Sequence, residues 1–206
     1  MKQGRRARGP AAPVAAAALA LLGAAGISAL ASAHELARTI CAACHGADGN
    51  SVAPNFPRLA GLQPEYITKQ LQDYLAGKRK SDVMAPMLVQ VNASDIPALA
   101  AYFAALKPGP GTKPADEKLA AAGKALYEDG NTATGVPACA GCHQEGGVGN
   151  ERYPRIAGQH GIYTTAQMMA FKTGARTNDR ARVMRAVAER LSEQEIAALA
   201  EYLAGL

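Results

Sequence analysis

Apolar residues recur at helical spacing in two segments that lie 100 residues apart. The two runs are Ile96, Leu99 and Phe103 in one segment, and Ile196, Leu199 and Leu203 in the other. Residues three or four positions apart share one face of an α-helix, so each run predicts a helix with one apolar face. Ser94 and Ser192 precede the runs and are the predicted N-caps.

Three further segments have helical patterns with recognisable ends. Asp116–Tyr127 opens with acidic residues, while Pro64–Ala76 and Ile162–Thr173 are followed by the glycines Gly77 and Gly174. Glycine readily adopts the left-handed conformation that often ends a helix. No stretch alternates convincingly between apolar and polar residues, so the fold class is predicted to be all-α.

The chain contains one sequence unit twice. The aligned segments are Pro57–Gly61 with Pro154–Gly158, and Gly49-Asn50 with Gly149-Asn150. Residues 107–115 between the copies are rich in proline and glycine, a composition typical of an extended linker. The pattern predicts a first domain at residues 34–108, the linker at 107–115, and a second domain at 116–206, related by internal duplication.

The first 33 residues have the pattern of a secretory signal peptide. A basic start is followed by an apolar run from Val14 to Leu30 and by Ala31-Ser32-Ala33, a small-x-small cleavage pattern. This predicts a signal peptide at residues 1–33 and export to the periplasm. A retained membrane anchor is the alternative, because cleavage after Ala33 leaves only a short segment before Cys41.

Removing this segment changes the charge of the protein. The whole chain has 22 basic and 17 acidic residues, and four of the basic ones lie in residues 1–33. The mature chain is therefore 18 − 17, or +1, and has no basic stripe of the kind that binds nucleic acid. With no tryptophan and only 5% aromatic residues, each small domain needs something besides side chains to fill its core.

All four cysteines lie in two Cys-x-x-Cys-His motifs, Cys41–His45 and Cys139–His143. A c-type haem needs two thiols to bond its vinyl groups and one imidazole to bind its iron, and each motif supplies all three. A redox dithiol, a zinc site or a pair of disulfides would leave both histidines unexplained. The sequence therefore predicts two covalently bound haem c groups.

The second axial ligand of each iron is expected to be a methionine. His45 and His143 supply the first ligand, and a methionine opposite them gives the ligation of an electron carrier. The repeat aligns Met84 with Met184, so these two are the predicted ligands, with Met87 as the nearby competitor in the first half. His160 would offer a bis-histidine site, but Gln63 stands at its place in the other copy.

The repeated haem motifs, the segments Asn55–Gly61 and Tyr153–Gly158 and the two methionines resemble the diheme cytochrome c4 family over the whole mature chain. The resemblance implies two class I cytochrome c domains packed about a pseudo-twofold axis. It also implies that the backbone carbonyls of Pro57 and Pro154 accept a hydrogen bond from the haem-ligating histidines.

Other repeated residues carry weaker signals. Arg58, Arg155, Tyr66 and Tyr163 are candidates for contacts with haem propionates or between the domains, although solvated arginines and packed tyrosines are equally consistent with the sequence. Exposed basic residues near the methionines would form rings that steer an acidic redox partner, although a simple exposed, charged loop is the commoner meaning of such a run. The basic residues are Lys78, Arg79 and Lys80 before Met84, and Arg176, Arg180, Arg182, Arg185 and Arg190 around Met184.

These features predict an electron carrier and not an enzyme. The resemblance implies a monomeric periplasmic protein, in loose association with the membrane at most, that takes electrons from a cytochrome bc1-type complex and gives them to a cbb3-type oxidase. One alternative is the diheme subunit of a larger dehydrogenase, such as flavocytochrome c sulfide dehydrogenase. A diheme peroxidase is less consistent with the sequence, because both copies have a methionine at the expected place.

Overall fold

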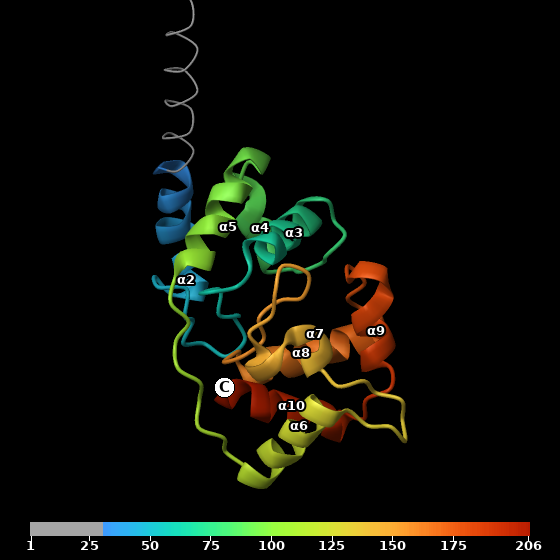
Figure 1. The fold of residues 1–206 in the computed structure, drawn as a ribbon. Coiled ribbons are helices and arrows are strands. Elements are labelled where there is room, and N and C mark those ends of the chain that lie inside the picture. The colour runs from blue at the N-terminus through green and yellow to red at the C-terminus, as the bar shows by residue number, and fades with distance from the viewer. Residues whose placement is uncertain (1–30) are drawn as a thin grey trace, which may run out of the picture.

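A computed structural model describes residues 31–206, which form two groups of helices joined by an extended segment (Figure 1). The only β-type pairing in these residues is an isolated bridge between Asn131 and Val136. The all-α prediction is therefore confirmed. The predicted signal peptide falls almost entirely outside the described residues. None of the helices described is long and apolar enough to cross a membrane.

The first half begins with a helix that runs directly into the first haem motif. Residues 31–36 are helical and continue through a π-helical turn. The elements in order are η1 (Ala37–Cys41), α2 (Ala42–His45), α3 (Pro64–Leu75), α4 (Met84–Met87), η2 (Leu88–Gln90), η3 (Ala93–Asp95) and α5 (Ile96–Ala105).

The core of the first half lies between α3 and α5. Ile96, Leu99 and Phe103, the apolar run of the sequence pattern, are all buried on the inner face of α5. The leading helix packs on the same core: Ala33 is completely buried, and the His34 ring meets the Tyr102 ring edge to face at 4.9 Å. The predicted cleavage point after Ala33 thus lies inside a packed helix.

The second half repeats this arrangement. Its elements are α6 (Glu117–Asp129), α7 (Ala140–His143), η4 (Glu145–Gly147), α8 (Gly161–Thr173), η5 (Arg180–Arg182), α9 (Val183–Ala188) and α10 (Glu193–Gly205). In Figure 1 these helices are coloured yellow to red and lie below the green helices of the first half.

Helices α6 and α10 form the tightest contact of the second half. Gly123 on α6 faces the backbone of α10 so closely that a Cβ atom there would lie 2.0 Å from the carbonyl oxygen of Ala198. Next to this crossing, the Tyr127 and Tyr202 rings pack with their centroids 5.5 Å apart. A glycine is therefore required at the crossing because only hydrogen fits between the two backbones.

Two of the predicted helix ends are confirmed: Gly174 ends α8 in the left-handed conformation, and Ser192 caps α10 through a reciprocal hydrogen-bond pair with Glu195. Asp116, which was expected in the first turn of its helix, is instead the N-cap of α6, and α6 continues to Asp129. The prediction for Ser94 is wrong. A 3₁₀ turn starts at Asn92, two residues earlier, because Asn92 and Asp95 form the reciprocal pair there and the turn continues into α5.

Replacing Ser192 with Ala is expected to lower the free energy of unfolding by about 1 kcal/mol, because the Ser192 hydroxyl accepts from the Glu195 backbone N–H at 3.1 Å. Urea denaturation followed by circular dichroism measures the change. Ser94→Ala is the matched control and should change stability by less than ~0.5 kcal/mol. Equal losses in both variants would contradict the assignment of the cap.

The linker lies against both halves. Gly109 donates its N–H to the Asn50 side chain of the first half at 2.6 Å, and Thr112 donates to the Ala204 carbonyl of the second half at 2.6 Å. Arg58 also donates from Nη1 to the Pro110 carbonyl at 2.7 Å. Although its composition is that of a free spacer, this segment is tied down on both sides.

Candidate haem-binding sites

The four cysteines lie on two short helical turns. Cys41 ends η1 and Cys44 lies in α2, while Cys139 precedes α7 and Cys142 lies within it. All four thiols are unpaired and partly exposed. Cysteines at positions i and i+3 of a helical turn point to the same side, which is the placement needed to bond the two vinyl groups of one porphyrin.

Burial also sets the protonation of the thiols. It raises the pKa of the Cys139 thiol to about 11 and raises the pKa of Cys41 above its usual value. Since the thiolate is the reactive form, these thiols are held in their less reactive form at neutral pH.

Each motif histidine is buried and held by a proline carbonyl. Nδ1 lies 2.8 Å from the Pro57 oxygen in His45 and 2.9 Å from the Pro154 oxygen in His143. Because a carbonyl can only accept, Nδ1 carries the proton and Nε2 keeps its lone pair. Burial lowers the pKa of both imidazoles, although the proline carbonyls oppose this. A neutral imidazole with a free Nε2 and two unpaired thiols beside it is a donor set that fits haem c.

A glycine carbonyl shapes the loop that presents each proline. Gly49 accepts hydrogen bonds from the N–H groups of Leu59 and Ala60, at 2.8 and 3.1 Å. Gly147 does the same for Ile156 and Ala157, at 2.8 and 3.0 Å. The structural partner of Gly49 is therefore Gly147, and the alignment of Gly49 with Gly149 is wrong, because the loops between the haem motif and the proline differ in length.

Both predicted methionine ligands lie in short helices between the middle and the closing helix of their halves. Met84 begins α4 and packs against the first core, while the Met87 side chain is 42% exposed. Met184 lies half-buried in α9. Met168 and Met169 pack against the second core from α8, as expected of residues that fill space.

The turn before Met184 is held in an unusual conformation. Ala181 and Arg182 both have positive φ angles, 50° and 60°. Residues other than glycine adopt this conformation only when the surroundings require it. Here Arg185 donates to the Asp179 carboxylate from Nε at 2.7 Å and from its backbone N–H at 3.1 Å, which ties α9 to the preceding segment.

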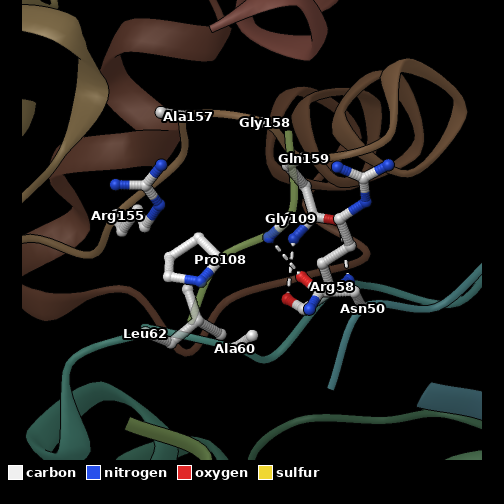
Figure 2. A pocket seen from close by; sticks show the side chains of 10 residues that line it. All are labelled: Asn50, Arg58, Ala60, Leu62, Pro108, Gly109, Arg155, Ala157, Gly158 and Gln159. Atoms are coloured by element: carbon white, nitrogen blue, oxygen red, sulfur yellow. Dashed lines mark hydrogen bonds between the residues drawn. The ribbon is translucent and has the colours of Figure 1, made fainter. Parts of the chain in front are cut away.

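Arg58 lies between the halves (Figure 2). Its backbone N–H donates to Gln159 Oε1 at 2.9 Å, and Gln159 Nε2 donates to the Arg58 carbonyl at 3.0 Å. Its Nε is buried without a hydrogen-bond partner among the described protein atoms. Arg58 and Arg155 both line a cavity of ≈ 10 Å³, which is room for about one water molecule.

The side chains of Gln63 and His160 also make hydrogen bonds between the halves. Gln63 accepts from the Arg155 N–H at 2.6 Å and donates to the Val148 carbonyl at 2.8 Å. Burial lowers the pKa of the Arg155 guanidinium. His160 Nε2 lies 2.8 Å from the backbone oxygen of Ser51 and 3.0 Å from its hydroxyl. His160, which the sequence offered as an alternative iron ligand, thus joins the two halves.

Tyr66 on α3 and Tyr163 on α8 also bond across the interface. The Tyr66 hydroxyl accepts from Arg176 at 3.2 Å, and the Tyr163 hydroxyl accepts from Arg79 at 3.0 Å. The prediction that these arginines belong to exposed basic rings is wrong, because each is only 8% exposed. The exposed basic residues that remain near the methionines are Lys78, Lys80, Arg180, Arg182 and Arg190.

Comparisons with known proteins agree with this geometry. The family model described as Cytochrome c matches residues 30–107 and 120–206. Cytochrome c4 of Azotobacter vinelandii is 46% identical over 179 residues, 81% of this chain and 84% of that protein. The thiosulfate dehydrogenase electron acceptor of Thiomonas intermedia (strain K12) is 40% identical over 167 residues, 80% of this chain and 77% of that protein.

A solved structure extends the likeness to the whole fold. The crystal structure of reduced recombinant cytochrome c4 from Pseudomonas stutzeri has a TM-score of 0.80 and 42% identity, over 86% of this chain and 98% of that chain. Because each matched region has its own Cys-x-x-Cys-His motif, the chain carries two covalently bound haem c groups. It is an electron carrier and not an enzyme. The chain belongs to the diheme cytochrome c4 family.

Proposed function

We propose that this carrier works in the periplasm and passes single electrons from a quinol-oxidising complex of the cytochrome bc1 type to a terminal oxidase of the cbb3 type. The main observation in its favour is that each half has its own thiols and histidine for one haem. The signal-peptide pattern of residues 1–33 supports export.

The proposed ligand sets are equivalent in the two halves. In the first, Cys41 and Cys44 bind the haem covalently and His45 and Met84 bind its iron; in the second, Cys139, Cys142, His143 and Met184 do the same. Met84 is preferred to Met87 because it packs against the core, whereas the Met87 side chain is largely exposed. Pro57 and Pro154 would keep each histidine in the tautomer that binds iron.

These ligands suit electron transfer and not catalysis. Each bound haem supplies an iron that accepts and releases one electron. With a histidine and a methionine both bound, each iron would have no open position for a substrate, and the thioether would favour a high potential. The exposed bases near the methionines, Lys78, Lys80 and Arg180 among them, would attract acidic partners into brief complexes.

A second candidate role is to accept electrons from a dehydrogenase that oxidises a sulfur compound. The relative from Thiomonas intermedia, whose name describes a thiosulfate dehydrogenase electron acceptor, supports it. This role is close to that of the diheme subunit of a larger dehydrogenase. It differs from the first proposal in the donor and not in the chemistry of the haems.

Reduction kinetics would separate the two donors. The oxidised protein is mixed with a bc1-type complex and quinol, or with a thiosulfate dehydrogenase and thiosulfate, and haem reduction is followed in a stopped-flow spectrophotometer. The proposal expects the bc1-type complex to reduce it faster, and expects the reduced protein to be oxidised by a cbb3-type oxidase. Faster reduction by the thiosulfate dehydrogenase would favour the second role. Rapid binding of carbon monoxide by the reduced protein would contradict the proposed ligation.

A further inference from the structure

The segment around Met84 exposes apolar side chains that lie close together in the chain. They are Val83, Ala85, Pro86, Met87 and Val89, which we call the apolar patch. Val83 is 52% exposed and Val89 is 84% exposed. Residues 83–94 contain no charged side chain, so solvent meets a neutral, apolar surface here.

The second half has charges at the corresponding places. Counted from the two methionines, Arg185, Glu189 and Arg190 stand where the first half has Ala85, Val89 and Gln90. Arg185 forms an ion pair with Asp179, and Glu189 forms one with Arg182. Helix α9 is thus surrounded by charges, whereas the equivalent helix α4 is not.

The core of the first half does not account for the apolar patch. The same segment already supplies Leu88 and Val91 to that core, where both are buried. Single exposed apolar residues are normal on a protein surface, but a contiguous group marks a place where another molecule binds. Methionine, here Met87, is common on such binding surfaces because its side chain adapts to different partners.

The position and charge of the apolar patch indicate what would bind there. Helix α4 begins with Met84, the proposed iron ligand, so a protein that covers the patch lies next to the first haem. Electron transfer requires such closeness, which makes a redox protein the fitting partner. The exposed charges just before the patch are Lys78, Lys80 and Asp82, two positive and one negative. A complementary partner has an apolar centre and a weakly acidic rim.

We propose that the apolar patch is the docking surface for one redox partner of this kind, and that this partner exchanges electrons with the first haem. The charged face around α9 then serves a different, acidic partner. Few charges meet at the patch, so transfer through it depends little on ionic strength, whereas transfer through the face around α9 slows as salt is added. The inference rests on the proposed function, in which the carrier meets a donor and an acceptor.

The test compares second-order rate constants of electron transfer between the intact diheme protein and a bc1-type complex or a cbb3-type oxidase, in a stopped-flow spectrophotometer at several ionic strengths. Val89→Glu is expected to slow one of the two reactions by about tenfold, because a charge must lose its water in an apolar contact. Val52→Glu is the matched control. Val52 is 95% exposed and lies in the same half but outside the apolar patch, so this variant should slow neither reaction.

Two more variants separate docking from other effects. Val89→Gln adds no charge and should slow the same reaction to a smaller extent, with both midpoint potentials unchanged. Arg180→Gln should slow only the other reaction, and only at low ionic strength. The proposal is overturned if Val89→Glu slows neither reaction more than Val52→Glu does, or if it slows both equally.

An electrode assay keeps this test independent of the named complexes. A parent protein that reacts with neither complex would contradict the proposed function and not the docking surface. Voltammetry on gold coated with a methyl-terminated alkanethiol then probes the apolar patch directly, and Val89→Glu should transfer electrons more slowly than Val52→Glu. On a carboxylate-terminated coating the two variants should be equal. Equal rates on the methyl-terminated coating would overturn the proposal.

Discussion

Replacing Met184 with Ala is expected to lower the reduction potential of the second haem by roughly 0.2 V and to leave the first nearly unchanged. Axial ligands set haem potentials over a range of about 0.8 V, and loss of the thioether removes the ligand that stabilises the reduced iron. The contact between Arg185 and Asp179 ties α9, which contains Met184, to the preceding segment. The backbone around position 184 should therefore keep its shape in the variant.

Spectroelectrochemical titration of each haem measures this effect, and carbon monoxide should bind the reduced variant at the opened position. Met168→Leu is the matched control. Met168 packs in the second core from α8, and leucine conserves its volume, so both potentials should stay within the error of the measurement. If Met184→Ala leaves both potentials unchanged, another residue binds the iron of the second half.

Replacing Gly123 with Ala is expected to destabilise the second half by about 2 to 3 kcal/mol. Alanine favours a helix by up to ~1 kcal/mol over glycine, but the new Cβ would lie 2.0 Å from the Ala198 oxygen and 2.5 Å from the Ala198 carbonyl carbon. Both are backbone atoms of α10, so α6 and α10 must move apart and lose the packing of Tyr127 on Tyr202.

Thermal and urea denaturation, monitored by far-ultraviolet circular dichroism, measure this loss. Gly141→Ala is the control, because nothing lies within 4 Å of a Cβ at Gly141, and Ala43 stands at the same place in the first motif. The control variant should be as stable as the parent or slightly more so. If Gly123→Ala is as stable as the control, α6 and α10 are not in close contact at this point.

The features predicted correctly from the sequence are those set by neighbouring residues. The helix end at Gly174, the cap at Ser192 and the haem motifs all depend on contacts within a few positions, and local pattern is sufficient for these. The predicted cap at Ser94 is wrong although it is local, because Asn92 competes for the same role and forms the reciprocal pair with Asp95.

The contacts between the halves could not be read from local pattern. Arg79 and Arg176 lie in charged segments that look solvated, and only the packing of the other half makes them buried. The sequence nevertheless contained a signal for these contacts between the halves. Tyrosine, glutamine and arginine recur with one spacing in both copies, whereas a solvated loop does not require the same three polar residues in both. The alignment of Gly49 with Gly149 failed for a related reason, since a difference in loop length is not visible in a matched dipeptide.

Arg79 of the first half bonds to Tyr163 of the second, and Arg176 of the second half bonds to Tyr66 of the first. Such reciprocal contacts are typical of an isologous dimer, but here both partners belong to one polypeptide. In a dimer of identical subunits, one substitution always changes both sides of the axis. Here each half can mutate alone. Lys69 and Asp73, for example, have no copy in the second half, where Ala166 and Ala170 stand at the equivalent positions. Fusion of the two units therefore permits the two iron environments to diverge, and with them the direction in which an electron prefers to move inside the molecule.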